Sequence, residues 1–310
     1  MTGLQILGLG HALPKKAVTN DDLANLVDTS DEWIKSRTGI RERRFASKGE
    51  TTTTLAVEAA KNAMRKAGVC AKDISVCIAA TFTPDVQMPS VACSVAQQLC
   101  LENVSVAFDL NAACTGFVHA VASAHAILSA QGGRCALIIG SETISRVLDM
   151  TDRSTCVLFG DGAGAAVVAL SDAHPYCFCG SVTPDTQSLH CRENNLGIEM
   201  DGANVYRFAT LTVPEILRRI MQKSEKSLDE IDYFVCHQAN SRIIEQIARR
   251  LGAHSEKFYL NLQRYGNTSA ASIPIALSEM SHHGLLPQGT TIICAGFGAG
   301  LTCAGALLTF

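Results

Sequence analysis

Apolar strand-like runs alternate with helical patterns along the whole chain. Segment 54–68 has apolar residues at helical spacing and ends at Gly68, a residue typical of helix C-caps. In this first half the pattern predicts strands ending at Gly10 and over 75–81, 104–110 and 135–140, with a helix over 112–130. In the second half it predicts strands at 231–236, 258–262 and 291–296, and helices over 240–251 and 268–283. Continuous apolar strands indicate sheets buried on both faces, so we expect two sheets with helices outside and between them.

The two halves of the chain resemble each other at an offset of 156 to 157 residues. Segments 54–68, 72–81 and 111–140 match, in the same order, 211–225, 229–238 and 267–296. The repeat predicts an N-terminal half over 1–172 and a C-terminal half over 173–310. Segments 144–159 and 174–204 interrupt it. We expect such insertions to form entrances and subunit contacts, because a duplicated core tolerates little change.

Composition narrows the class of protein. Apolar residues make up 47% and charged residues 18% of the 310 positions, which is typical of a tightly packed α/β protein. The net charge of −3 argues against a general nucleic-acid-binding surface. The 13 cysteines include no C-x2-C pair, so a zinc site is not expected. The N-terminus lacks a secretory pattern and no run of 18 apolar residues occurs, which predicts a cytoplasmic protein with reduced thiols and no membrane span.

Three polar residues stand at related places in the repeat. Cys114 follows a predicted strand and begins a predicted helix, a position that favours thiolate. His237 ends the strand at 231–236, and Asn267 begins the helix that corresponds to the Cys114 helix. The twofold relation therefore predicts that Asn267 lies close to Cys114. Each residue alone could be structural, but His and Asn together can donate hydrogen bonds to a developing enolate oxygen.

The glycine-rich segment 296–300 lacks the lysine of a phosphate-binding loop and the spacing of a dinucleotide-binding motif. We interpret it as flexible backbone beside the thiol, suited to an oxyanion hole built from N–H groups.

These residues lie within motifs that resemble β-ketoacyl-[acyl-carrier-protein] synthase III, a condensing enzyme with the thiolase fold. The resemblance covers essentially the whole chain and rests on 29–44 (TSDEWIKSRTGIRERR), 111–117 (NAACTGF), 151–155 (TDRST), 158–166 (LFGDGAGAA), 236–244 (CHQANSRII), 266–274 (GNTSAASIP) and 296–300 (GFGAG). It implies an α/β protein of five layers, α-β-α-β-α, made of two duplicated halves. It also implies a homodimer in the cytoplasm.

The resemblance implies a ping-pong mechanism. Cys114 would attack a short acyl-CoA, typically acetyl-CoA, with the N–H groups of Cys114 and Gly300 as the oxyanion hole. Malonyl-acyl carrier protein would then lose carbon dioxide while His237 and Asn267 hold the enolate. No metal and no bound cofactor is implied, because the CoA thioester is a substrate. The residues that match CoA contacts are Trp33, Arg37, Arg153 and Asn240.

The chain departs from the family pattern near the acyl pocket. Met88 stands where the family places a gating aromatic residue contributed across the dimer, and Ala299 interrupts a loop that is often three glycines. Ile144 and Phe297 match other pocket positions, and the segment 174–200 is shorter than usual. These departures leave the length and branching of the primer open.

An acidic carrier protein requires a basic docking surface. Two clusters qualify: Arg218, Arg219 and Lys223 on one predicted helix, and Arg242, Arg249, Arg250 and Lys257 on or after another. Each could also be an ordinary solvated helix face.

Three other functions compete with the fatty acid role. A related enzyme of secondary metabolism would keep Cys114 and His237. A thiolase would require a second catalytic cysteine near the C-terminus, where Cys303 lies on a predicted strand. A scaffold without activity would be expected to lack at least one of the three polar residues, and all three are present.

Overall fold

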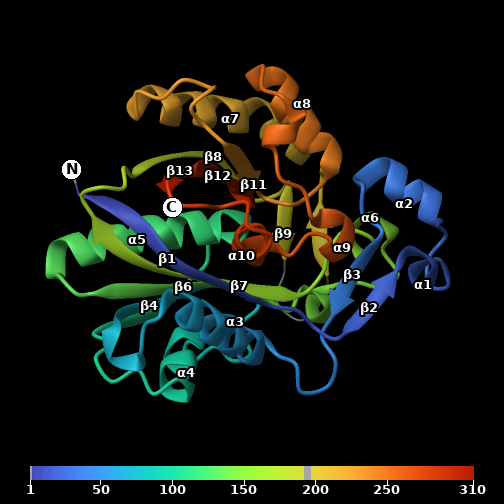
Figure 1. Cartoon of the computed structure of the whole chain (residues 1–310). Coiled ribbons are helices and arrows are strands. Elements are labelled where there is room, and N and C mark those ends of the chain that lie inside the picture. Colours follow the sequence, from blue (N-terminus) through green and yellow to red (C-terminus); the bar gives the residue numbers. More distant parts are fainter. Residues whose placement is uncertain (1, 192–196) are drawn as a thin grey trace.

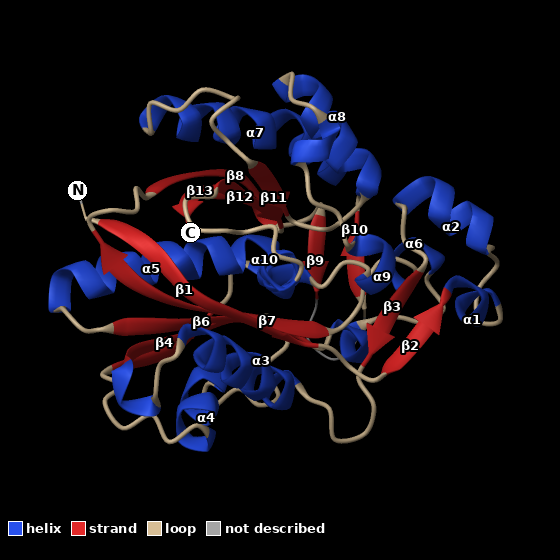
Figure 2. Cartoon of the chain, in the orientation of Figure 1, coloured by secondary structure: helices blue, strands red, loops and turns tan. Residues whose placement is uncertain are grey.

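The computed structural model describes residues 2–191 and 197–310, and its helices and strands form stacked layers (Figures 1 and 2). The first sheet lies beneath the second and holds, in order, β1 (Gly3–Ala12), β7 (Gly162–Ser171), β6 (Cys135–Glu142), β4 (Ile74–Ala80) and β5 (Val106–Leu110). The second holds β8 (Cys177–Asp185), β13 (Gly300–Thr309), β12 (Thr291–Gly298) and β11 (Tyr233–Cys236).

Helices cover both outer faces and fill the space between the sheets. Outside the first sheet lie α3 (Thr52–Ala67) and α4 (Val91–Gln98), and outside the second lie α7 (Gly202–Lys223) and α8 (Ser241–Leu251) (Figure 1). The central layer is formed by α5 (Gly116–Gln131) and α10 (Ser272–His282), each of which contacts strands of both sheets. The predicted five layers are therefore present.

The strand directions repeat as well. In the first sheet β1, β7 and β6 are successively antiparallel and β6 is parallel to β4. In the second, β8, β13 and β12 are antiparallel and β12 is parallel to β11. The sheets are not fully separate, since β1 and β13 pair in parallel with Gln5 opposite Thr309. The boundary predicted at 172/173 falls between β7 and β8 and stays a prediction.

Two expectations about the second half were wrong. Segment 258–262 forms no strand: Phe258 makes an isolated bridge to Phe234, and α9 (Leu262–Tyr265) begins at once. The N–H of the buried Asn261 is not free for a neighbouring strand, because it donates to the Gln238 side chain, while the Asn261 side-chain amide donates to Glu279. The segment 174–204 is also only partly an insertion, since β8 within it occupies the place that β1 has in the first half. Residues 192–196 of that segment lie outside the described residues.

Smaller elements extend from the core around one end of the layers. Two short strand pairs stand there, β2 (Lys16–Thr19) with β3 (Glu42–Phe45) and β9 (Leu189–Cys191) with β10 (Ile198–Met200). The short helices are α1 (Asn20–Ala24), α2 (Asp31–Thr38) and α6 (Arg153–Cys156), with 3-10 turns η1 (Ala71–Asp73), η2 (Ala113–Thr115), η3 (Ile144–Val147), η4 (Ser255–Lys257) and η5 (Ser269–Ala271).

Close backbone approach brings the two halves together at the site. Gly140 of β6 lies against η5, where a β-carbon would stand 2.2 Å from the carbonyl oxygen of Ala270. Only glycine permits this contact, so the second half's turn rests directly on the first half's sheet. Among the described residues, one helix, Ala113–Gln131, is long and apolar enough to cross a membrane by composition. Its contacts with β4, β6, β12 and β13 are those of a core helix.

Candidate active site

Two turns of the same shape lead into the central helices. In the first half the Asn111 side chain accepts the N–H of Ala113 at 3.3 Å, and in the second the Asn267 side chain accepts the N–H of Ser269 at 2.9 Å. Ala113 and Ser269 both have a left-handed backbone, with φ of 44° and 48°. Each strained residue directly precedes the residue that the turn presents, Cys114 in one half and Ala270 in the other. Such strain is stored where the surroundings hold a functional group in place.

Cys114 is buried, and its thiol donates to the Ser269 hydroxyl over 3.5 Å. Burial raises the pKa of Cys114 to about 12, although the bond to Ser269 and the backbone N–H act in the opposite direction. The expectation that the turn by itself favours thiolate was therefore wrong, because desolvation outweighs the few aligned N–H groups. The resting nucleophile is a thiol, and the reaction must remove its proton.

His237 follows β11 and is only 1% exposed. Its Nδ1 lies 2.7 Å from the hydroxyl of Ser272, the first residue of α10. That hydroxyl already accepts the N–H of Gln238 at 3.4 Å, so its own proton is available for Nδ1. This assignment leaves the other ring nitrogen, Nε2, protonated. Burial lowers the pKa of His237 to about 3, which keeps the ring neutral.

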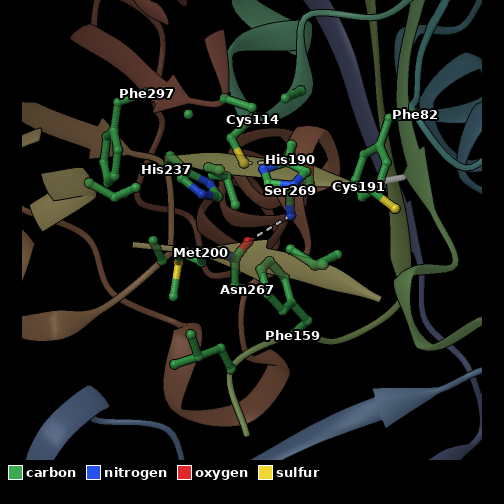
Figure 3. A pocket seen from close by; sticks show the side chains of 18 of the residues that line it. Phe82, Cys114, Phe159, His190, Cys191, Met200, His237, Asn267, Ser269 and Phe297 are labelled. Atoms are coloured by element: carbon green, nitrogen blue, oxygen red, sulfur yellow. Dashed lines mark hydrogen bonds between the residues drawn. The ribbon is translucent and has the colours of Figure 1, made fainter. Parts of the chain in front are cut away.

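Cys114, His237 and Asn267 line one cavity of about 540 Å³, as the sequence predicted (Figure 3). The remaining lining residues are mainly apolar and come from both halves; they include Phe82, Val147, Leu158, Phe159, Leu189, Ile198, Met200, Val205, Ile243 and Phe297. Phe297 stands edge-on to the His237 ring, with 5.2 Å between centroids. Segments 144–159 and 174–204 both contribute, so the interruptions of the repeat do shape this cavity.

The glycine-rich segment 296–300 is a tight hairpin between β12 and β13 rather than a flexible loop. Gly298 and Ala299 line the cavity, whereas Gly300 is not among the lining residues and pairs with Asp185 of β8. The sequence placed this segment correctly beside the cavity. The position of Gly300 outside the lining does not support its predicted oxyanion-hole role and favours Ala299.

Of the predicted CoA contacts, Trp33 and Arg153 come together although 120 residues separate them. The Arg153 guanidinium lies 5.0 Å from the centre of the Trp33 ring and donates to the carbonyl of Asp28. Asn240 lines the cavity, caps α8 and donates to the carbonyl of Arg37 at 3.1 Å. Arg37 itself is exposed. Helix α2 and the N-terminal end of α8 therefore meet beside the cavity.

Two predicted acyl-pocket residues do not line this chain's cavity. Met88 is 86% exposed, on the segment between β4 and α4. Ile144 is fully buried behind the wall, packed with Phe159 and Ile198. The sequence comparison identified the right region but could not distinguish a lining side chain from one directly behind it.

The predicted basic residues separate into two groups. Arg242, Arg249 and Arg250 are exposed on α8, and Arg218 of α7 donates to the carbonyl of Arg250. Lys257 is different. Its ammonium group donates to three backbone carbonyls, those of Leu228, Asp229 and Ile231. It holds a turn together and is not available for docking.

Sequence reasoning missed Ser269, Ser272 and the buried carboxyl of Glu142. The repeat offered a signal for the first, because Ser269 corresponds to Ala113 and precedes the position equivalent to the nucleophile. Among the described residues, no group of three or more His, Cys, Asp or Glu side chains is arranged to hold a metal ion.

Known proteins share both the sequence and the fold. Family models described as 3-oxoacyl-[acyl-carrier-protein (ACP)] synthase III and its C-terminal part match residues 108–183 and 221–310. The β-ketoacyl-[acyl-carrier-protein] synthase III of Clostridium botulinum (strain Hall) is 43% identical, over 100% of this chain and 99% of that protein. The chain belongs to the β-ketoacyl-[acyl-carrier-protein] synthase III family. A relative in Clostridium acetobutylicum with the same name is 42% identical over 99% of both chains.

The crystal structure of the synthase III from Aquifex aeolicus VF5 has a TM-score of 0.95 and 41% identity, covering 99% of this chain and 100% of that one. The predicted thiolase-like fold is therefore confirmed. A thiolase reaction is not supported, because Cys303 is fully buried on β13 and is not among the residues that line the synthase III cavity.

Proposed function

We propose that this synthase III carries out the initiating condensation of fatty acid synthesis. It joins an acyl-CoA to malonyl-acyl carrier protein and yields 3-oxoacyl-carrier protein, CoA and carbon dioxide. The observation that carries the proposal is the convergence of Cys114, His237 and Asn267 on one largely apolar cavity. The full-length relatives support the fatty acid role and do not favour a role in secondary metabolism.

In the first half-reaction, Cys114 attacks the thioester carbonyl of the acyl-CoA. A bond forms between Sγ and the carbonyl carbon, and the tetrahedral intermediate then releases CoA. The oxyanion is held by the N–H of Cys114 and by that of Ala299, which takes the role that the sequence assigned to Gly300. Because Ala299 lines the cavity and Gly300 does not, the Ala299 amide is the better placed donor.

In the second half-reaction, the malonyl group loses carbon dioxide and its thioester becomes an enolate. His237, protonated on Nε2, and the Asn267 amide donate to the enolate oxygen. The enolate carbon attacks the acyl group on Cys114, and the thiolate leaves. A neutral His237 suits this role, because the very low pKa keeps it a hydrogen-bond donor rather than a proton source.

CoA would enter past Trp33 and Arg153. In the structure the guanidinium lies over the indole ring, so an adenine that stacks between the two requires the arginine to move away. Arg37 and Asn240 would flank the nucleotide and the pantetheine arm. The reaction needs no bound cofactor, because the thioester itself is the substrate.

The primer pocket is proposed to hold a short acyl chain such as acetyl. Met88, which extends into solvent from this chain, would reach the partner's pocket in a homodimer. Methionine is more flexible than an aromatic ring and could accommodate longer or branched primers. The carrier protein would dock on Arg242, Arg249 and Arg250, with the enzyme dissolved in the cytoplasm.

The test separates the two half-reactions. Wild type, Cys114→Ser and Asn267→Ala would be given acetyl-, propionyl-, isobutyryl- and medium-chain acyl-CoA, and the covalent acyl-enzyme would be measured by mass spectrometry before malonyl-carrier protein is added. We expect Cys114→Ser to lose the acyl label, and Asn267→Ala to keep the label but lose condensation by about 100-fold or more. Acyl label on Cys114→Ser at the wild-type rate would refute the assignment.

A further inference from the structure

Glu142 is a fully buried carboxyl group for which the proposed mechanism has no role. It ends β6, directly beside the turn that carries Ser269. Its Oε2 atom accepts hydrogen bonds from the hydroxyl groups of Thr81 and Thr83 at 3.1 and 2.5 Å, and from the N–H groups of Phe82 and Thr83. Its Oε1 atom accepts only the long 3.3 Å contact from the Phe82 N–H. One carboxylate oxygen is thus saturated and the other is nearly unoccupied.

Ser269 connects this carboxyl group to the nucleophile. Its hydroxyl oxygen accepts the thiol proton of Cys114 at 3.5 Å. The Ser269 side chain also lowers the pKa of Glu142, so the hydroxyl lies near the carboxyl group. A serine hydroxyl has one proton to donate and can accept at the same time, so it can pass a proton from one neighbour to the other. The side chains of Cys114, Ser269 and Glu142 therefore lie next to one another in that order.

We propose that Glu142 is the acceptor of the Cys114 thiol proton, which reaches it through the Ser269 hydroxyl as the sulfur attacks the acyl-CoA. The inference rests on Cys114 being the nucleophile of the proposed function. Glu142 acts through Ser269 and does not touch the substrate, so it is a positioning residue for the proton.

The proton balance closes over both half-reactions. During acylation, Cys114 gives its proton to Ser269 while Ser269 gives its own to Glu142; the S–C bond forms, and the departing CoA thiolate takes a proton from water. During condensation the enolate carbon attacks the acyl group and Cys114 leaves as thiolate. Glu142 then returns its proton through Ser269. In the acyl-enzyme Glu142 is neutral, so a fully buried carboxylate does not have to persist.

The proton affinity of Glu142 suits this exchange. Burial raises its pKa to about 7, against the lowering effects of Thr83, Phe82, Thr81 and Ser269. His237 cannot serve near neutrality, because burial lowers its pKa to about 3. A base is most effective when its pKa lies near the working pH.

The ionisable groups that lie near Glu142 influence its protonation. Cys114 in η2 is the ionisable neighbour that interacts with it. Arg146 of η3 donates to the Thr83 carbonyl and to Thr52 of α3, and it pairs with Asp85, so its charge is directed at the same loop but not at the carboxylate. No described residue forms an ion pair with Glu142.

Ser269→Ala is the sharpest variant for a test. The equivalent position in the first half is Ala113, which already has nearly the same left-handed φ, so alanine is compatible with this turn. Glu142→Gln tests the other end of the path. Glu279→Gln is the matched control, since Glu279 is another buried carboxyl whose partners Asn261, Arg264 and Tyr265 do not line the cavity.

The experiment is rapid-quench measurement of acyl-enzyme formation from acetyl-CoA, followed by mass spectrometry, between about pH 5 and about pH 9. For wild type we expect the rate to fall as the pH drops below about 7, because a protonated Glu142 cannot accept the thiol proton. Ser269→Ala and Glu142→Gln should both lose this acidic limb of the pH–rate profile, that is, the fall in rate below about pH 7. Both should react about 100-fold more slowly near neutrality. The double variant should be no slower than the slower single variant, and Glu279→Gln should keep the limb.

The proposal is overturned if Ser269→Ala reacts within about threefold of wild type or keeps the same limb, or if Glu142→Gln lowers the rate equally at every pH. A purely structural role would give the second pattern. The proposed function fails separately: Cys114→Ala would then still form the acyl-enzyme. Loss of label in Cys114→Ala with an unchanged Ser269→Ala profile would refute only the proton path.

Discussion

Gly298 lies against Cys114 so closely that a β-carbon on it would stand 3.2 Å from the thiol sulfur and 3.0 Å from the Cys114 β-carbon. The hairpin that follows β12 therefore forms one wall of the nucleophile's site, and only glycine leaves room there for the sulfur to move toward a substrate. This contact crosses from the second half of the chain to the first.

Gly298→Ala should consequently block acylation rather than folding. The added methyl group meets the sulfur, so we expect acyl-enzyme formation to fall by about 100-fold or more while the melting temperature changes little. Gly180→Ala on β8 is the control, because its β-carbon would come closest to the Phe178 ring, at 3.3 Å, and Gly180 is not among the residues that line the cavity. An acylation rate in Gly298→Ala equal to that of the control would contradict the prediction.

Ser272→Ala should impair condensation and spare acylation. Without the hydroxyl, Nδ1 of His237 loses the partner 2.7 Å away that leaves Nε2 protonated. We expect condensation with malonyl-carrier protein to slow by about 100-fold, with acyl-enzyme formation within a few-fold of wild type. Ser278→Ala on the same helix, whose hydroxyl bonds to His11 instead, is the matched control. Equal losses in both half-reactions would show that Ser272 acts on more than the histidine.

Acidification should destabilise the fold partly through His237. Its pKa of about 3 in the folded protein lies below the ordinary value of 6.5, so the unfolded chain binds this proton more readily. The resulting stability is present above about pH 6.5 and is lost as the pH falls toward 3, at ~1.4 kcal/mol per pH unit. Urea unfolding of wild type and His237→Gln over this range should show a shallower pH slope for the variant. Identical slopes would contradict the burial argument.

Arg43 of β3 is fully buried and should matter for stability. Its guanidinium donates to the Asn20 side chain and to the carbonyl groups of Val18 and Val157. These hydrogen bonds connect β2 and α1 to the chain that follows α6. Arg43→Met leaves these acceptors without a donor, and we expect it to lower the free energy of unfolding by about 2–4 kcal/mol. Arg44→Met, at a partly exposed neighbour paired with Glu42, should cost less than about 1 kcal/mol. Chemical denaturation measures both.

Charge reversal on α8 should weaken carrier-protein binding. The double change Arg249→Glu and Arg250→Glu should raise KM for malonyl-carrier protein about tenfold or more, most strongly at low salt, and leave acylation by acetyl-CoA unchanged. Lys61→Glu reverses a charge on α3, which covers the opposite outer face (Figure 1), and should leave KM unchanged. A salt-independent KM in the α8 variant would argue against docking there.

The sequence predicted which residues meet at the site because two similar halves are expected to be related by a twofold axis. Matching Asn111 with Asn267 therefore placed the two equivalent turns next to each other across that axis, and the structure shows these turns in contact. The strands and helices with strong periodicity also appeared where expected. Segment 258–262 did not, because a short apolar run takes the same form in a strand and in a packed loop.

The sequence could not predict effects that depend on how deeply a side chain is buried. Ile144 and Phe159 are both apolar residues of the segment 144–159. Phe159 lines the cavity, whereas Ile144 lies behind it. Lys257 resembles the neighbouring arginines, but its ammonium is enclosed by carbonyl groups. The thiol pKa of Cys114 was misjudged for the same reason, since the helix start is visible in a sequence and the surrounding desolvation is not.

The pairing of Gln5 with Thr309 links two sheets that otherwise have their own strands, order and outer helices. The residues proposed for the reaction come from both sides of that link: Cys114 from the first half, and His237 and Asn267 from the second. The cavity therefore lies at the junction of the two halves, and its geometry depends on how the two sheets are held against each other.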